Sequence, residues 1–167
     1  MSTKQINTDL FNYHRRNTVE VNVGGVKIGC NNPVRVQSMT NTSTMDTEGS
    51  VAQVKRIVAK GGEIVRLTTQ GSREATNLGA IKNLLEKENC TVPLVADVHF
   101  NASVADVAAQ YADKVRVNPG NYVDTARTFK HIDYSDEEYA EELVRLRKRF
   151  VAFLDLCKRE GKARCCS

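Results

Sequence analysis

Charged side chains stand where the strands of a parallel sheet should be apolar. Arg66 and Arg116 each interrupt a short run of apolar residues. In a third run Asp97 and His99 are two residues apart, so on a strand they share one face. A guanidinium buried without an anionic partner costs free energy, because the charge loses its water. We therefore expect both arginines to face anions.

The anion could be a ligand or a carboxylate of the protein itself. An arginine side chain presents a planar fork that binds phosphate through two hydrogen bonds. Ligands of α/β folds bind at the carboxyl ends of the strands, where Arg66 and Arg116 are expected to lie. The alternative is a structural ion pair between Arg66 and Asp97. We favour a ligand such as phosphate, because polar residues recur at the ends of all the predicted strands.

The sequence favours no metal site. Asp97 and His99 have the spacing of two metal ligands, but one such pair supplies too few of them. We expect His99 to hydrogen-bond a ligand or to transfer a proton near neutral pH. The five cysteines form no Cys-x-x-Cys pair, which argues against zinc and against a disulfide framework; they are Cys30, Cys90, Cys157, Cys165 and Cys166. We expect them to be reduced thiols of a cytoplasmic protein.

Length and charge are those of one soluble domain. The chain has 167 residues, and its formal net charge of +4 comes from scattered basic residues rather than a stripe. This pattern suits a small anionic ligand and argues against nucleic acid. Residues 1–17 form a polar leader without the apolar segment of a signal peptide. No stretch is apolar enough to cross a membrane, so we expect the cytoplasm as the compartment.

Hydrophobic periodicity predicts a hairpin followed by four strand–helix units. Residues 19–28 alternate around Gly24 and Gly25, which is typical of a tight β-hairpin. The strands of the four units are predicted at 34–39, 63–68, 92–99 and 114–118. Strands that alternate with helices indicate parallel βαβ units, hence the α/β class. Four units fit an open doubly wound sheet or half of an eight-unit barrel.

Helix ends are marked by capping residues. Asp46 or Thr47 is expected to cap the first helix, with Gly61 as its stop, and Asn101 caps the third. Ser135 and Glu138 predict a capping box for the last helix, and Gly161 follows its end. This helix carries an apolar stripe that we expect to be buried: Tyr139, Leu143, Leu146, Phe150, Phe153 and Cys157.

Four blocks of sequence match a known family in order and spacing. They are Val36–Thr42, Ile64–Arg66, Pro93–Phe100 and Arg116–Asn121. Together they resemble the 4-hydroxy-3-methylbut-2-enyl diphosphate synthases, over about residues 15–163 and in the large, three-domain form. The resemblance implies the first four βα units of a TIM-type (β/α)8 barrel, preceded by the hairpin and incomplete in this chain.

The resemblance also implies a function. Enzymes of this family reductively open 2-C-methyl-D-erythritol 2,4-cyclodiphosphate in isoprenoid synthesis, with a [4Fe-4S] cluster in a separate domain. Ferredoxin or flavodoxin is the implied electron donor, and a homodimer is the implied assembly. Arg66 and Arg116 would clamp the diphosphate. The other implied contacts to the substrate are Asn118, Asn121, Asp97, His99, Gln37, Thr40 and Asn41.

The last residues depart from the family pattern. Residues 18–163 are expected to form the amino-terminal half of the barrel, and 164–167 to be a tail that matches nothing. With neither the later strands nor the iron–sulfur domain, we expect no cluster, no catalytic residues and no activity in this chain alone. Two other interpretations remain: a different anion-binding barrel, similar to dihydropteroate synthase, and a binding module without catalysis.

Overall fold

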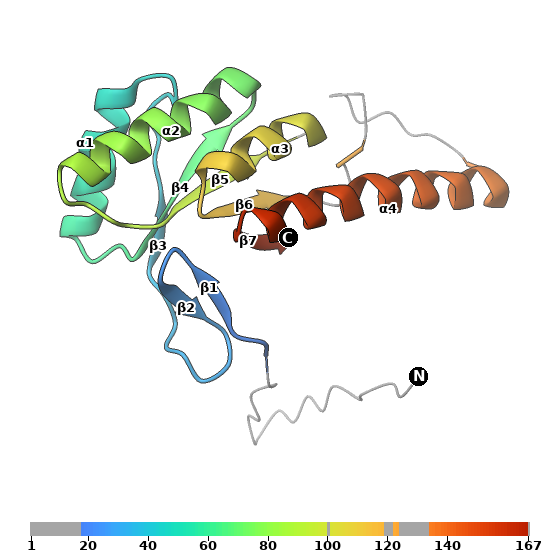
Figure 1. Ribbon diagram of the computed structural model, residues 1–167, viewed down its shortest axis with the longest axis horizontal. Helices are drawn as coiled ribbons and strands as arrows, with labels where there is room; N and C mark the ends of the chain where they lie inside the picture. Colours follow the sequence, from blue (N-terminus) through green and yellow to red (C-terminus); the bar gives the residue numbers. More distant parts are fainter. Residues whose placement is uncertain (1–17, 100, 119–121, 124–133, 167) are drawn as a thin grey trace.

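A parallel sheet of five strands forms the centre of the molecule (Figure 1). The computed structural model describes residues 18–99, 101–118, 122–123 and 134–166. The strands are β3 (Gln37–Met39), β4 (Ile64–Thr69), β5 (Leu94–Val98), β6 (Lys114–Val117) and β7 (Ala163–Cys166). Their spatial order is their chain order, and each neighbouring pair is parallel. A doubly wound sheet would reverse its order, so the arrangement is that of an incomplete TIM-type barrel, as predicted.

A helix connects each strand to the next. These helices are α1 (Thr47–Ala59), α2 (Ser72–Lys87), α3 (Ala102–Tyr111) and α4 (Asp136–Arg159). Their predicted caps are confirmed: Asp46 accepts from Gly49 N–H, Asn101 accepts from Ser103 N–H, and the capping box of α4 is formed. Gly61 and Gly161 follow α1 and α4 with φ of +90° and +64°, which favour glycine.

The main core lies between the sheet and the helices. One face of β4, β5 and β6 contributes buried apolar residues: Val65, Leu67, Leu94, Ala96, Val98, Val115 and Val117. The helices contribute Val51, Val54, Leu78, Ile81, Leu85, Val104 and Ala108, among others. Because side chains alternate along a strand, the other face of the sheet is left for the residues that lie between them. That second face carries Arg66, Asp97 and Arg116.

The predicted hairpin is confirmed and covers the amino-terminal end of the strands. It consists of β1 (Val21–Val23) and β2 (Val26–Ile28), joined by two glycines with positive φ. Two positive values are what a type I′ turn requires. Figure 1 shows the hairpin beneath the sheet, and a Cβ added at Gly24 would lie 3.0 Å from Cβ of Pro93. The hairpin therefore closes one end of the sheet, opposite the carboxyl ends.

The carboxyl-terminal residues add a fifth strand to the sheet. Ala163–Cys166 pair with β6 in parallel, whereas the periodicity of the sequence predicted no strand after the fourth unit. The expectation that residues 164–167 match no family pattern is a separate matter, because strand pairing uses the backbone and needs no particular motif. Among the described residues the sheet edges are thus β3 and β7. β3 is shorter than predicted, since it begins at Gln37.

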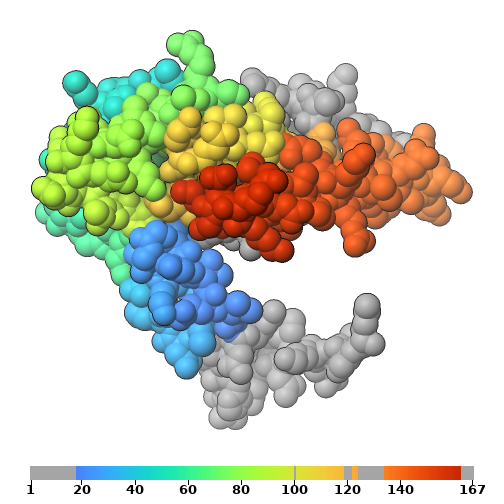
Figure 2. Space-filling view, viewed as in Figure 1, coloured from blue at the N-terminus to red at the C-terminus, as the bar shows by residue number. Residues whose placement is uncertain are grey.

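The buried stripe predicted for α4 is only half correct. Phe153 and Cys157 are buried, but Tyr139 is 56% exposed and Leu143 is 46% exposed. The helix has 24 residues, or about 36 Å at 1.5 Å per residue, which is longer than the strands it packs beside. Its amino-terminal half projects beyond the sheet (Figures 1 and 2). Within the described residues no helix has the length and apolar character needed to span a membrane.

Candidate anion-binding site

Strand register brings the predicted polar residues into two adjacent rows. Thr68, Asp97 and Arg116 are Cα partners across β4, β5 and β6. One row lower, towards the hairpin, Arg66 is level with Met39 of β3 and Val95 of β5. All of these positions share one face of the sheet, near the carboxyl ends of the strands, because side chains of paired residues point the same way.

Both arginines bind the same carboxylate. Arg116 Nη1 donates to Asp97 Oδ1 at 2.8 Å, and Arg66 Nη2 donates to Asp97 Oδ2 from the row below. His99 Nε2 lies 3.5 Å from Asp97 Oδ1. The Asp97 side chain is 3% exposed, whereas those of Arg66 and Arg116 are 27% and 24% exposed. The carboxylate is therefore enclosed, and each guanidinium still reaches solvent.

The two arginines keep the Asp97 carboxyl group ionised. Burial raises the pKa of Asp97, but hydrogen bonds from Arg116 and Arg66 outweigh it, and the pKa lies below its usual value. Asp97 is therefore ionised at neutral pH and pairs with both guanidiniums. In addition, Arg66 Nε is buried without a hydrogen-bond partner in the described part of the chain.

The segment after β3 is tied to the end of β4. Thr40 N–H donates to the carbonyl of Arg66 at 2.9 Å, and the Thr44 hydroxyl donates to the carbonyl of Thr68 at 2.6 Å. Both threonines are buried. These bonds fix the backbone of the two strand residues that carry inward side chains. Thr40 and Thr44 therefore hold the backbone beside the site, and the predicted contact of Thr40 with a ligand stays a prediction.

The remaining predicted residues lie in several places. Gln37 is level with Ile64, one row below Arg66. The side chain of Asn41 accepts a hydrogen bond from Gln53 Nε2 of α1 at 2.7 Å. Asn118 follows β6 directly and is partly buried. Asn121 lies outside the described residues.

Two conclusions follow for the sequence analysis. The ion pair between Arg66 and Asp97, left open as an alternative, is present, and Arg116 joins it. Because both arginines have a partner within the protein, their role in binding a ligand stays a prediction. Thr68, level with Asp97 on the same face, was missed. The alternation of side chains would have identified it, since it stands two residues after Arg66.

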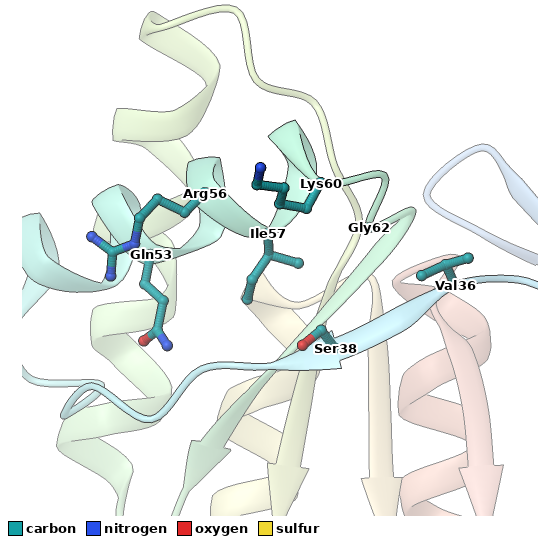
Figure 3. A pocket seen from close by; sticks show the side chains of 7 residues that line it. All are labelled: Val36, Ser38, Gln53, Arg56, Ile57, Lys60 and Gly62. Carbon is teal, nitrogen blue, oxygen red and sulfur yellow. The ribbon is translucent and has the colours of Figure 1, made fainter.

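A separate hollow lies between β3 and α1. It has a volume of about 290 Å³ and is lined by Val36, Ser38, Gln53, Arg56, Ile57, Lys60 and Gly62. Figure 3 shows Ser38 and Ile57 lying between the strand and the helix, while the charged groups of Arg56 and Lys60 lie apart from each other. Since these cations do not converge, the hollow lacks the arrangement found at Asp97.

The described residues do not fit an iron–sulfur cluster. Nowhere in the described ranges do three His, Cys, Asp or Glu side chains gather as metal ligands. Cys30 is exposed beside the hairpin, Cys90 precedes β5, and Cys157 is buried in the core. Three cysteine ligands would have to converge on one cluster, and these three do not.

Comparison with known proteins shows where the chain belongs. One solved structure that aligns with this chain is that of dihydropteroate synthase from Burkholderia cenocepacia. The alignment covers 88% of this chain and 62% of the synthase, at 18% identity and a TM-score of 0.49. A likeness at this level carries no functional argument. The chain is 64% identical over 155 residues to 4-hydroxy-3-methylbut-2-en-1-yl diphosphate synthase (flavodoxin) of Bacteroides thetaiotaomicron. It is 44% identical over 149 residues to the chloroplastic, ferredoxin enzyme of Arabidopsis thaliana.

These matches cover most of this chain and a small part of the relatives. They span 93% of the chain and 25% of the Bacteroides protein, and 89% of the chain and 20% of the Arabidopsis protein. Residues 18–162, from the hairpin through α4, match the GcpE TIM-barrel domain. This chain is therefore a member of the GcpE TIM-barrel domain family.

Proposed function

We propose that this chain supplies part of the substrate pocket of a 4-hydroxy-3-methylbut-2-en-1-yl diphosphate synthase. The relatives carry that activity in their names, and the chain matches their barrel domain. The substrate would be 2-C-methyl-D-erythritol 2,4-cyclodiphosphate, a small dianion. The observation that carries the proposal is the pair of partly exposed arginines on one buried carboxylate at the carboxyl ends of the strands.

Each residue of the cluster has a role in this proposal. Arg66 and Arg116 would bind diphosphate oxygens through their partly exposed guanidiniums. Asp97 would hold the two forks in place before the ligand arrives, which lowers the entropy cost of binding. His99, 3.5 Å from Asp97, would hydrogen-bond the ligand or transfer a proton.

The reductive step belongs to parts of the enzyme beyond this chain. A [4Fe-4S] cluster would supply the electrons, and the described residues do not fit its ligand set. Flavodoxin is the proposed donor, as in the name of the Bacteroides relative. We propose a cytoplasmic enzyme whose complete form is a homodimer. Alone, the chain would bind substrate without turning it over.

Calorimetric titration of the chain with the cyclodiphosphate tests the proposal. We expect binding that is lost in the double variant Arg66→Ala, Arg116→Ala. The alanine changes also leave Asp97 without its ion-pair partners. A second double variant, Arg66→Lys with Arg116→Lys, therefore keeps both positive charges. Lysine cannot form the planar fork, so we expect its affinity to fall about tenfold, the loss of roughly one charge-assisted hydrogen bond.

The matched control removes two arginines elsewhere. Arg35→Ala, Arg56→Ala makes the same charge change at the opposite end of β3 and on α1. We expect this variant to bind as the unmodified chain does. If the control lost as much affinity as the variants of Arg66 and Arg116, the effect would come from the net charge of the chain and not from the site. No binding by a chain that unfolds cooperatively would contradict the proposal.

A further inference from the structure

Thr68 of β4 lies on the same face of the sheet as the arginine cluster. It is the Cα partner of Asp97 and stands two residues after Arg66. Neighbouring strands lie about 4.8 Å apart, so the side chains of Thr68 and Asp97 stand next to each other. Within β4 only Arg66 and Thr68 are not fully buried. Thr68 therefore adds a hydroxyl group to the partly exposed edge of the cluster.

The fold makes no use of this hydroxyl group. In the part of the chain that the structure describes, it forms no hydrogen bond. Neighbouring threonines use theirs. The Thr69 hydroxyl donates to the carbonyl of Leu67 at 3.3 Å. The Thr44 hydroxyl donates to the carbonyl of Thr68 at 2.6 Å. A valine at position 68 would have nearly the same shape, so packing alone does not require a hydroxyl there.

The Thr68 hydroxyl is nevertheless held in a defined place. The carbonyl of Thr68 accepts from Thr44, and the carbonyl of Thr44 in turn accepts from Asn77 Nδ2 of α2 at 2.7 Å. These two hydrogen bonds connect the end of β4 to α2. The χ1 angle of a threonine is also restricted, because its Cβ is branched. A donor that is already fixed loses less entropy when it binds a ligand.

We propose that Thr68 is a further ligand-binding residue of the candidate site. Its hydroxyl donates a hydrogen bond to a phosphate oxygen of the anion that Arg66 and Arg116 bind. Thr68 and Arg116 stand on either side of Asp97 in one row, and Arg66 lies in the row below. The inference rests on the proposed function, because it takes the two arginines as the anion-binding groups.

The chemistry of a diphosphate fits this arrangement. The backbones that carry Thr68 and Arg116 are two strand spacings apart, or roughly 10 Å. The long side chain of Arg116 and a ligand with two phosphate groups would together span that width. Phosphate oxygens point in several directions, so one group can accept from a guanidinium and a hydroxyl at once. A hydroxyl adds a hydrogen bond without adding charge.

Two substitutions separate the hydroxyl from the shape of the side chain. Thr68→Val removes the hydroxyl, and Thr68→Ser keeps it. We expect Thr68→Val to bind the cyclodiphosphate about tenfold more weakly in calorimetric titration, the loss of one hydrogen bond to a charged group, and Thr68→Ser to stay within about threefold. The urea midpoint of Thr68→Val should not fall, because the fold does not use the hydroxyl. A purely structural role for Thr68 would lower that midpoint.

Inorganic pyrophosphate is the second ligand in the titration, because it carries the phosphate oxygens alone. We expect Thr68→Val to weaken its binding by a similar factor. An effect seen only with the cyclodiphosphate would overturn the assignment of the hydroxyl to a phosphate oxygen. The matched control is Thr91→Val, which removes a hydroxyl before β5, at the other end of the sheet. We expect this control to bind both ligands as the unmodified chain does.

The outcomes distinguish this inference from the proposed function. Unchanged affinity in Thr68→Val, with binding lost in Arg66→Ala, Arg116→Ala, would overturn the role of Thr68 and leave the proposed function standing. Pyrophosphate binding that depends on Thr68, without binding of the cyclodiphosphate, would support the role of Thr68 and contradict the proposed function. If the folded chain bound neither ligand, both would be wrong.

Discussion

Asp97 is the residue on which the candidate site depends, because it organises both arginines. Its two carboxylate oxygens each accept from a different strand, so one buried side chain links β4, β5 and β6. Removing its charge would leave two guanidiniums facing each other beside the sheet. The residue therefore has a structural role whether or not a ligand binds.

Asp97→Asn is expected to destabilise the chain at neutral pH. Breaking a fully buried ion pair costs about 3–5 kcal/mol, and since both arginines are partly exposed we expect about 2 kcal/mol. Urea unfolding at pH 7 measures the change. Asp155→Asn, an exposed carboxylate on α4 without an ion pair in the described structure, is the control and should change the free energy of unfolding by less than about 0.5 kcal/mol.

The same residue predicts a dependence of stability on pH. The pKa of Asp97 is lowered in the folded chain, so the unfolded chain binds a proton more readily. Its contribution is present above the unfolded pKa of about 3.9 and is lost as pH falls through the lower, folded value. Unfolding midpoints measured from pH 7 to pH 3 should drop less steeply in Asp97→Asn. Parallel curves for the variant and the unmodified chain would contradict this role.

At the scale of the element, removing the N-cap of α1 and removing the N-cap of α4 should affect the stability of the chain differently. Asp46 caps α1, whose residues Val51 and Val54 are buried in the core, whereas Ser135 caps the projecting end of α4. Loss of either cap costs its helix about 1 kcal/mol. Asp46→Ala should lower the free energy of unfolding of the whole chain by that amount. Ser135→Ala should instead fray the first turns of α4 and leave global unfolding nearly unchanged.

Hydrogen exchange combined with urea unfolding distinguishes the two cases. Faster exchange confined to the first turns of α4 is expected for Ser135→Ala, with an unfolding midpoint close to that of the unmodified chain. An equal fall in global stability for both variants would mean that the first turns of α4 are coupled to the core. In that case the projecting half would not be an independent surface.

Local signals predicted the elements better than the contacts between them. The caps depend on groups a few residues away, so Asn101 and Ser135 were predicted correctly and Asp46 was one of the two residues predicted for α1. The exposure of Tyr139 and Leu143 was not, because periodicity shows which face is apolar and not whether a neighbour covers it. β7 was not predicted for a related reason. Its four residues carry no motif, and they form a strand because the edge of β6 is available for pairing.

The candidate site was predictable in its residues and not in its pairing. Alternation along the strands placed Arg66, Asp97 and Arg116 on one face, and the register confirms this. Which acceptor each arginine takes depends on how far its side chain reaches between rows. Arg66 crosses from the lower row to Asp97, and no spacing in the sequence specifies that diagonal. Likewise, no spacing in the sequence specifies the hydrogen bond that Asn41 accepts from Gln53.

For the whole molecule, the open edge at β3 has the strongest consequence for behaviour in solution. All three residues of β3 are exposed, and so are Val34 and Val36 before it. An exposed edge strand with apolar side chains is a template for pairing with other chains, and natural proteins protect such edges with charges. We therefore expect the chain to aggregate through this edge at high concentration.

Val36→Lys should reduce that aggregation without lowering stability. The Val36 side chain is 55% exposed, so a lysine there points its charge into solvent, and the backbone bonds of Val36 to Glu63 and Ile64 can persist. Light scattering on heating should show later onset of aggregation, with the free energy of unfolding changed by less than about 0.5 kcal/mol. Val19→Lys makes the same change at an exposed valine outside any strand and should have little effect. Equal protection by both variants would assign the effect to net charge, and the edge of β3 would then not be the surface through which the chains associate.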